Sequence, residues 1–375
     1  MLSKGMEHVA EKKKSILVAA QNLHIGGVQA ALVNYLKELS RDGSYDIDVF
    51  AFTGGALQEK LPKDVRLTLG GKCLQLSATS FDEIRQSGSL FDRLLRVFVT
   101  AFAKIFGTER FYRLCFRHKK PQKTYDIAVS YFTDVPAGVF NKGTNLYIAA
   151  YVTAAEKLAF VHTDPLLSGF DKEYCRRIYK PFDKIVCVSD AVREKFAILL
   201  PAYKEKTETR HTVFDTDEIQ AQAAAYEPFE KGVFDIVTVA RVDNASKRID
   251  GIVRLCARLK SCGKTAFTWR IVGDGPDRKN DEALAKELDV AELVRFEGQK
   301  ENPYPYIAKS DLFALYSAYE GYPLVVGEAL ILHTPILTTA YAAAKEQIPK
   351  DCGVIAQTDE AFFEALCARM DGAVC

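Results

Sequence analysis

The order strand, glycine turn, helix, strand occurs near the start of the chain and again in its second half, and this repeat limits the fold more than any other feature. The apolar run SILVAA at 15–20 leads through Gly26-Gly27 into a helix with its apolar residues on one face, and YDIDVFAFTG at 45–54 follows as the next strand. The same order returns from FDIVTVARV at 234–242 onward. Strands that alternate with helices form parallel sheets covered on both faces. The sequence therefore predicts an α/β protein with two Rossmann-like, doubly wound domains facing a cleft.

A polar stretch marks the boundary between the two predicted domains. LPAYKEKTETRHTVFDTDEI at 200–219 lacks the apolar runs found on either side of it, which is typical of a hinge. A chain of 375 residues is also long for one domain. We predict a first domain over 1–205 and a second over 206–375, with Ser189 and Asp215 as helix N-caps near the hinge.

The overall charge excludes one large class of partner. Fifty Lys and Arg residues nearly balance 49 Asp and Glu residues, so a net charge of +1 gives no general attraction to nucleic acid. The nine cysteines show no C-x-x-C spacing, and the charged start MLSKGMEHVAEKKKS lacks the apolar core of a signal peptide. No run reaches the roughly 20 apolar residues of a membrane-spanning helix. These features indicate a cytoplasmic protein with reduced thiols.

Residues 89–123 differ from the rest of the chain. They place apolar residues at helical spacing and hold nine Lys and Arg residues against Asp92 and Glu109, a net charge of +7 without His118. One interpretation is a surface helix pair with a solvated basic face. The other is an interfacial segment that contacts anionic lipid, which would make the protein peripheral on the inner face of the plasma membrane.

Two short patterns resemble cofactor or metal motifs but are better explained otherwise. The turn VGDGPDRKN at 272–280 has Arg278 where the dinucleotide fingerprint needs a third glycine. Asp46 and Asp48 lie within one strand and point to the same side, so a solvated strand end explains them better than a metal site. We expect no metal and no cofactor. Three histidines have no ligand partners at useful spacing: His24, His211 and His333.

Two cations follow the first strand of the second domain. Arg241 comes directly after the strand, and Lys247 lies six residues later, just before a helix. The carboxyl ends of parallel strands face the usual ligand crevice. An Arg and a Lys at this edge suit a diphosphate, because Arg clamps two oxygens and Lys adds a compact charge. The alternative is an ordinary pair of surface cations.

The stretch SAYEGYPLVVGEAL at 317–330 carries two glutamates eight positions apart. Pro323 suits the first turn of a helix, and the free N–H groups that follow it form an anion site together with the helix dipole. Glu320 lies just before this site and Glu328 about one turn into the helix. Such a site suits a ligand with both phosphate and hydroxyl groups, such as a sugar nucleotide. The alternatives are a loop acid for Glu320 and a helix-surface charge for Glu328, although the apolar neighbours of Glu328 indicate a partly buried carboxylate.

These motifs resemble the retaining GT-B glycosyltransferases of the family-4 type. VARVDNASKRID is similar to that family's R-[LV]-D-x-x-K-x-x-[DE] stretch, IVGDGPDR to its G-D-G-P turn, and Glu320 with Glu328 to its E-x7-E pair. IGGVQAALVNYLKEL resembles the family's glycine loop and first helix. KLAFVHTDP resembles the W-x-H segment of members that build bacterial surface polysaccharides. The resemblance covers most of residues 15–360.

The resemblance implies a role for each matching residue. Glu320 would contact the hydroxyls of the transferred sugar, and His162 would orient that sugar. Glu328 would bind the nucleotide ribose, while the glycine loop of the first domain would close over the donor phosphates. The residues implied to bind the donor are Gly26, Gly27, Arg241, Lys247, Gly321, Tyr322, Pro323, Leu324, Val325 and Glu328.

The resemblance also implies a reaction. A sugar would pass, with retention and without a metal, from a nucleotide sugar to a saccharide or lipid-linked acceptor in capsule, exopolysaccharide or other cell-surface glycan synthesis. The first domain would bind the acceptor and the second the donor. The chain departs from the family pattern at Phe160, Thr212 and His333, and it ends at Cys375 where members continue into a helix that crosses back to the first domain. Without that helix, domain closure would be weaker.

Two other functional classes share parts of this pattern. A catalytically weak or inactive GT-B protein would bind a nucleotide sugar or a partner protein without transfer; the departures favour it, and intact Glu320, Arg241 and Lys247 oppose it. An epimerase or a phosphorylase shares the two-domain architecture. The E-x7-E pair with its upstream cations opposes an epimerase, and the length of the chain opposes a phosphorylase.

Overall fold

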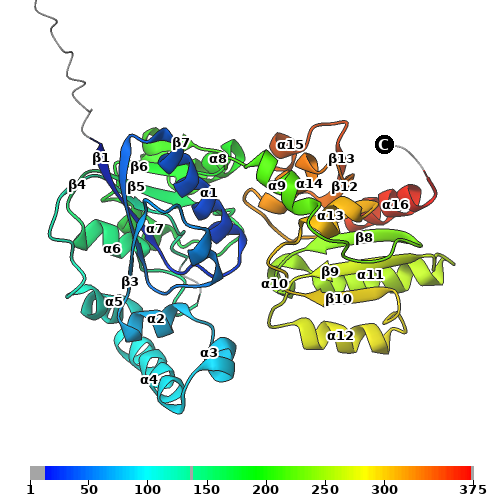
Figure 1. The fold of residues 1–375 in the computed structure, drawn as a ribbon, viewed down its shortest axis with the longest axis horizontal. Helices are drawn as coiled ribbons and strands as arrows, with labels where there is room; N and C mark the ends of the chain where they lie inside the picture. The colour runs from blue at the N-terminus through cyan, green and yellow to red at the C-terminus, as the bar shows by residue number, and fades with distance from the viewer. Residues whose placement is uncertain (1–12, 136–137, 373–375) are drawn as a thin grey trace, which may run out of the picture. The chain divides into compact units, whose positions relative to one another are not determined.

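The structure, a computed structural model, describes residues 13–135 and 138–372 and has the predicted alternation of parallel strands and helices (Figure 1). The chain forms two compact units. The first unit holds the residues up to Val161 together with 169–186 and 205–208, and the second unit holds 162–168, 187–204 and the residues from Thr209 onward. The predicted pair of doubly wound α/β layers is confirmed.

The first sheet has the strand order β3-β2-β1-β4-β5-β6-β7. The third strand in this order, β1, pairs in parallel with both β2 and β4, so the strand order reverses between β1 and β4. The apolar run of β1 is buried on both faces, since Ile16 to Ala20 are all 3% exposed or less. The strands are β1 (Lys14–Ala20), β2 (Tyr45–Ala51), β3 (Arg66–Leu69), β4 (Tyr125–Ser130), β5 (Ala154–Val161), β6 (Lys184–Cys187) and β7 (Thr207–Thr209).

The second sheet repeats this plan with the order β10-β9-β8-β11-β12-β13. Here β8 pairs in parallel with β9 on one side and β11 on the other, so the order reverses between β8 and β11. In open α/β sheets, ligands bind beyond the carboxyl ends of the strands at such a reversal. The strands are β8 (Phe234–Val239), β9 (Phe267–Val272), β10 (Val294–Gly298), β11 (Leu312–Leu315), β12 (Ile336–Thr339) and β13 (Gly353–Ala356).

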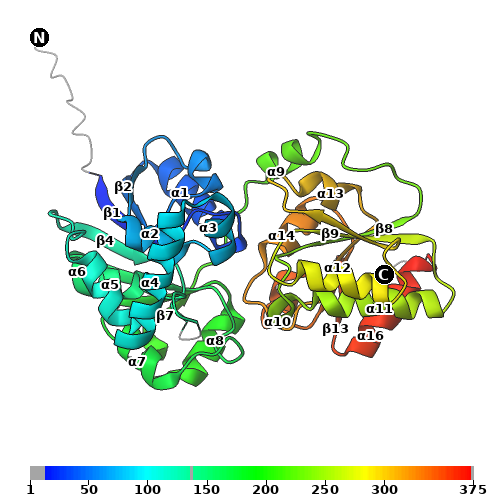
Figure 2. The same cartoon turned by 90° about the horizontal axis from the view of Figure 1, so that it is seen from below.

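Helices cover both faces of the second sheet. Because side chains alternate along a strand, Ile236 of β8 packs into one apolar cluster and Val237 into another. The first cluster contains residues of α11, α12 and α16, and the second contains residues of α13, α14 and α15. Figure 2 shows α11 and α12 side by side along one side of this sheet. The helices of this unit are α8 (Asp190–Leu199), α9 (Thr216–Ala223), α10 (Asn244–Lys247), α11 (Ile249–Ser261), α12 (Arg278–Glu287), α13 (Tyr304–Lys309), α14 (Leu324–Ile331), α15 (Ala344–Gln347) and α16 (Asp359–Met370).

Residues 89–123 contain the predicted helix pair. A capping box between Ser89 and Asp92 starts α4, and Gly107 with φ +90 separates α4 from α5. Figure 1 shows α2, α3, α4 and α5 together at one end of the first unit. The remaining α-helices are α1 (Gly27–Asp42), α2 (Lys72–Ala78), α3 (Phe81–Ser87), α4 (Leu90–Phe106), α5 (Thr108–Phe116), α6 (Thr144–Tyr151) and α7 (Lys172–Tyr179). The 3₁₀ helices are η1 (Ala56–Lys60) and η2 (Pro201–Lys206).

The predicted helix caps are present. The Ser189 side chain accepts a hydrogen bond from the Val192 amide, and the Asp215 side chain accepts one from the Glu218 amide. Among the described residues, no helix combines the length and the apolar character needed to cross a bilayer.

Candidate functional site

The loops after β8 and β11 meet where the strand order of the second sheet reverses. Lys247 ends the short helix α10 after β8, and Glu320 lies in the loop after β11. The Lys247 ammonium donates a hydrogen bond to the Glu320 carboxylate, and the two form an ion pair. Only 22% of the Lys247 side chain and 10% of the Glu320 side chain are exposed, so the pair is largely shielded from water. Two residues 73 positions apart that the sequence predicts for the site are thus in direct contact.

Hydrogen bonds from neighbouring strands hold this ion pair in place. The Ser317 hydroxyl donates to Glu320 Oε1 over 2.7 Å, and the Thr339 hydroxyl donates to the Ser317 carbonyl over 2.6 Å. The Ala318 amide donates to the Ser246 carbonyl over 2.8 Å, which joins the β11 loop to α10. The sequence analysis missed Ser317 and Thr339. In the sequence, only the short spacing between Ser317 and Glu320 could have indicated the role of Ser317. Thr339 is far from both in the sequence and reaches the site only in the tertiary structure.

The G-D-G turn after β9 supports the loop that carries both predicted cations. A Cβ atom on Gly273 would lie 1.9 Å from the Ala240 carbonyl oxygen, and one on Gly275 would lie 2.2 Å from the Val242 carbonyl oxygen. Gly273 also has φ +153, which side chains disfavour. Glycine is therefore required here for close packing of two backbones. This turn supports a binding loop and is not a dinucleotide fingerprint.

Arg241 lies at the exposed end of the same loop. Its guanidinium makes no hydrogen bond or ion pair with any residue that the structure describes, in contrast to Lys247. A cation in this state is available to an incoming anion without first breaking an internal pair.

Helix α14 begins at Leu324, one residue later than the sequence analysis expected. Pro323 is the N-cap, with φ −67 and ψ 120, so the expectation that it occupies the first helical turn is wrong by one position. The Gln347 side chain donates to the Pro323 carbonyl over 2.8 Å and fixes the entry to the helix. The amides of Leu324 and Val325 lie in the first turn, where no carbonyl of the helix is available to them. The predicted anion site is thus the start of α14.

Gly321 packs against the segment after β5. A Cβ atom on Gly321 would lie 2.2 Å from the His162 carbonyl oxygen, so only glycine allows this approach. The structure therefore brings the backbone of His162 next to the residue that follows Glu320. Tyr322 is half-buried beside them, with its ring 5.5 Å from that of His211.

Glu328 is buried one turn into α14, at 8% exposure, as the sequence analysis expected. Its partner is the Tyr304 hydroxyl on α13, which donates to Glu328 Oε1 over 3.4 Å. Burial raises the pKa of Glu328 to about 7, and the hydrogen bond from Tyr304 offsets only part of that effect. The carboxyl therefore changes its charge near neutral pH. Additional hydroxyl donors from a ligand would favour the charged form.

Gly26 and Gly27 start α1 in the first unit. Gly26 has an extended backbone, with φ 180 and ψ 162, and a Cβ there would meet only the flexible Gln29 side chain, 2.5 Å from Oε1. A Cβ on Gly27 would meet nothing within 4 Å. The glycine loop leads directly into a 16-residue helix, as the sequence predicts, and the first-turn amides of that helix have no carbonyl of the helix as partner.

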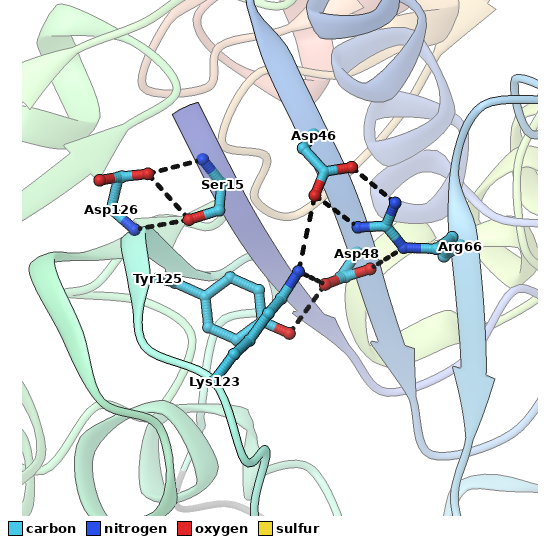
Figure 3. Close-up of polar contacts among 7 residues, drawn as sticks. All are labelled: Ser15, Asp46, Asp48, Arg66, Lys123, Tyr125 and Asp126. Carbon is cyan, nitrogen blue, oxygen red and sulfur yellow. Dashed lines mark hydrogen bonds and ion pairs between the residues drawn. The ribbon is translucent and has the colours of Figure 1, made fainter. Parts of the chain in front are cut away.

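The D-x-D pair in β2 belongs to a structural network and not to a ligand site (Figure 3). Arg66 on β3 donates to both carboxylates, 2.8 Å to Asp46 Oδ2 and 2.7 Å to Asp48 Oδ1, and Lys123 lies 2.6 Å from Asp48. The hydrogen bond from Arg66 lowers the pKa of Asp46. Burial raises the pKa of Asp48, but its bonds to Arg66, Lys123 and Tyr125 outweigh that effect and lower it overall. The pair lies near the start of β2, at the edge opposite the carboxyl ends of the strands.

One cluster contradicts the expectation that His211 has no partners. His211 Nε2 lies 2.5 Å from Glu346 Oε1, and one ligand atom each of His211, Glu346 and Asp190 lie within 4.8 Å of one another. Glu346 also accepts hydrogen bonds from the amides of Asp190 and Ala191, over 2.9 and 3.2 Å, and so caps the start of α8. Capping accounts for this geometry without an ion.

Comparison with known proteins gives matches in sequence and in fold. Residues 233–371 match the family model described as "Glycosyl transferases group 1". A Campylobacter jejuni protein named N-acetylgalactosamine-N,N'-diacetylbacillosaminyl-diphospho-undecaprenol 4-alpha-N-acetylgalactosaminyltransferase is 31% identical over 166 residues, 43% of this chain and 44% of the relative. A lipopolysaccharide core biosynthesis glycosyltransferase of Rhizobium meliloti is 34% identical over 20% of this chain and 21% of its own length. These matches span less than half of each relative.

Solved structures match over nearly the whole chain. HepE of Anabaena in complex with UDP superposes with a TM-score of 0.62 at 16% identity, over 96% of this chain and 90% of that one. A mutant of S. aureus TarM in complex with Fondaparinux, alpha-GlcNAc-glycerol and UDP superposes with a TM-score of 0.67 at 12% identity, over 96% and 93%. At these identities the likeness is one of fold. The chain therefore has the GT-B fold, and its residues 233–371 match the model of the glycosyl transferases group 1 family.

Proposed function

We propose that the protein transfers a sugar, with retention of configuration, from a UDP-sugar or similar nucleotide sugar to a saccharide or lipid-linked acceptor in the synthesis of a cell-surface glycan. The observation that carries the proposal is the Lys247–Glu320 pair at the strand reversal, next to the start of α14. The family match and the structural likeness to proteins solved with UDP support it.

The departing diphosphate is the group that most needs stabilisation in such a reaction. Charge develops on its oxygens as the bond to the sugar breaks, and fixed donors in a shielded site stabilise that charge. Lys247, Arg241 and the first amides of α14 supply cations and N–H donors within one set of loops. No strong general base is required for this step. Because these protein groups would stabilise the negative charge on the leaving group, we propose a metal-independent reaction without a cofactor.

The carboxylates match the hydroxyl groups of the donor. When a diphosphate takes the Lys247 ammonium, Glu320 loses its ionic partner and becomes a strong acceptor for sugar hydroxyls. Glu328 lies one turn into α14 and suits the ribose hydroxyls, which would replace the water that the buried carboxylate has lost. His162 is proposed to orient the transferred sugar, since its backbone adjoins Gly321.

The two units are assigned complementary tasks. The second unit, which contains the cations and α14, would bind the donor. The first unit would bind the acceptor, with Gly26 and Gly27 at the start of α1 near the transferred group. We propose that residues 1–205 and 206–375 are the corresponding functional domains.

The first unit also supports an association with the membrane. The apolar side chains of one face of α4 are more than half exposed, and we call this face the α4 stripe. Arg93 and Lys104 flank it on the helix, which is the arrangement of an interfacial helix on anionic lipid. We propose a cytoplasmic protein that is peripheral on the inner face of the plasma membrane. The stripe comprises Leu90, Phe91, Leu94, Val97, Phe98, Ile105 and Phe106.

Nucleotide binding and turnover test the proposal together. Thermal shifts would be measured with UDP, GDP, ADP and dTDP and their sugar conjugates, with and without EDTA, followed by NMR of the transfer product. We expect a shift for one nucleotide family that EDTA does not change, and a product with the anomeric configuration of the donor. A product of inverted configuration would rule out retention. A requirement for a divalent ion would rule out metal independence and direct attention to His211 and Glu346.

The alternative is a GT-B protein that binds nucleotide sugar or a partner protein without transfer. The His333 departure favours it, since this residue has φ +55, a conformation that glycine adopts more easily. Nucleotide shifts without turnover on any saccharide or lipid-linked acceptor would support this alternative.

A further inference from the structure

The helices α2, α4 and α5 line a cavity of about 400 Å³ that is open to the surface of the first unit, far in sequence from the residues assigned to the donor. Its wall is formed mainly by apolar side chains. Val99 and Phe111 are 2% and 5% exposed and belong to the buried part of this wall. The volume falls within the range of about 300–1,000 Å³ that is usual for small-molecule sites.

The cavity adjoins the exposed apolar surface of the unit. Phe98 lines the cavity and also belongs to the α4 stripe, where it is 64% exposed. Leu114 of α5 lines it as well and is 57% exposed. The same side chains thus form the rim of the cavity and part of the apolar surface. A hydrocarbon chain could pass from that surface into the cavity without crossing a polar boundary.

One charged residue lines the cavity. Lys72 precedes the apolar part of α2, its side chain is 53% exposed, and its ammonium lies 2.6 Å from Asp92 at the start of α4. Further cations of the segment form no ion pair within the described part of the chain, among them Lys104 and Arg110. An apolar cavity with one cation in its lining matches a ligand that combines a hydrocarbon chain with an anionic head group.

We propose that this cavity binds the hydrocarbon chain of the lipid-linked acceptor, with the phosphate of the lipid near Lys72. This assignment rests on the proposed function, because it gives the acceptor of that reaction a second point of attachment. The acyl chain of an anionic phospholipid has the same chemistry and is the competing source. The chain of the acceptor is the better match to a discrete cavity, since a bilayer lipid needs only the α4 stripe.

Gly71 provides a way to fill the cavity without straining the backbone. It lines the cavity, its φ of −70 and ψ of 166 suit any residue, and a Cβ there would meet nothing within 4 Å. Gly71→Phe should therefore fold and occupy the space. Gly232→Phe in the second unit is the matched control, because a Cβ on Gly232 also meets nothing within 4 Å.

The test is photolabelling of the full chain on bilayer nanodiscs. One probe is a polyprenyl diphosphate with a diazirine in its chain, and the other is phosphatidylglycerol with a diazirine in its acyl chain. We expect the polyprenyl probe to label peptides of α4 and α5, with at least a tenfold loss in Gly71→Phe and no change in Gly232→Phe. Equal labelling of Gly71→Phe and the wild type overturns the proposal. Equally strong labelling of the cavity peptides by the phospholipid probe assigns the site to the bilayer and also overturns it.

Two further measurements keep the outcome interpretable. Melting temperatures establish that Gly71→Phe is folded, and Leu114→Asp at the exposed rim is a second variant that should lower labelling by the polyprenyl probe. Labelling needs no donor, so it is independent of turnover. Absence of transfer by the wild type with labelling intact would refute the proposed function alone. Transfer with labelling that Gly71→Phe does not reduce would refute the cavity assignment alone.

Discussion

The two units share one strand order but differ in where they place their large apolar side chains. In the first unit, α4 and α5 expose eight of them between Leu90 and Leu114. In the second unit, the exposed ones among the described residues all precede β8 and are spread along the chain: Leu166, Leu167, Ile198, Val213, Tyr226 and Val233. The second unit thus has scattered exposed apolar side chains, whereas the first gathers them on one pair of helices, which is typical of an interaction site.

The cations at the Lys247–Glu320 pair and in the segment 89–123 also differ. In the second unit, cations such as Lys247 and Arg270 form ion pairs with acids of the same unit. In the segment 89–123, Lys104, Arg110 and Arg117 are exposed and form no ion pair within the described part of the chain. Paired cations fix the geometry of a site, while unpaired cations on a surface attract anions from outside. A shielded ion pair in one unit and exposed, unpaired cations in the other thus occur on the same order of strands.

The largest effect on activity is expected at the Lys247–Glu320 ion pair. Lys247→Ala removes the cation assigned to the leaving diphosphate and leaves Glu320, only 10% exposed, without its partner. We expect kcat/KM for transfer to fall roughly 10²–10³-fold, equivalent to about 3–4 kcal/mol. Steady-state release of the nucleotide measures it. Lys279→Ala, an exposed cation of the same unit, is the control, and a similar loss in both variants would contradict a specific role for Lys247.

The next effect concerns the folding of the second unit. Gly273→Ala places a Cβ 1.9 Å from the Ala240 carbonyl oxygen, so the two loops must separate. We expect a loss of about 3 kcal/mol in the free energy of unfolding. Urea unfolding followed by the fluorescence of Trp269, the single tryptophan and a buried residue of β9, reports this unit directly. Gly232→Ala should leave the midpoint unchanged, and an unchanged midpoint for Gly273→Ala as well would show that the close approach is not required.

Glu328 gives a smaller effect whose sign depends on pH. Its folded pKa of about 7 lies above the ordinary value of 4.5, so the protein loses stability as pH rises between these values. Glu328→Gln removes the cost of ionisation and should be more stable than the wild type by about 2 kcal/mol at pH 8, with little difference near pH 4. Nucleotide affinity of the wild type should rise from pH 6 to 8 and lose this dependence in the variant. Urea titrations and calorimetry at each pH check both trends; flat profiles would mean that Glu328 does not titrate there.

The smallest effect is expected at the α4 stripe. Leu94→Glu puts a charge in the centre of the apolar face and should weaken partitioning to anionic vesicles roughly tenfold, or about 1.5 kcal/mol. Sedimentation with phosphatidylglycerol vesicles at low and high salt measures it. Ile198→Glu is a matched control, since Ile198 is 67% exposed and Leu94 is 63% exposed. Equal losses in both variants would remove the contrast between the two units.

Much of the fold could be predicted because its strongest signals are local. Continuous apolar strands, the Ser189 and Asp215 caps and the cations after β8 are all visible within a few residues. Other features depend on partners distant in the sequence. The strand β3 has only four residues with two of them exposed, so its pattern is weak, and Gln347 reaches Pro323 only through the fold. His211 was misjudged because Glu346 lies 135 residues away.

The roles of Glu320 and Lys247 were predicted separately, and the structure adds that they are paired to each other before any donor arrives. These two groups together therefore contribute almost no net charge to the site. A free phosphate ion would have to separate them and could offer nothing to the carboxylate that it releases. A sugar nucleotide satisfies both at once, with its diphosphate on the ammonium and its hydroxyls on the carboxylate. If the proposed function holds, the ion pair would favour a ligand that carries both a diphosphate and hydroxyl groups over small anions.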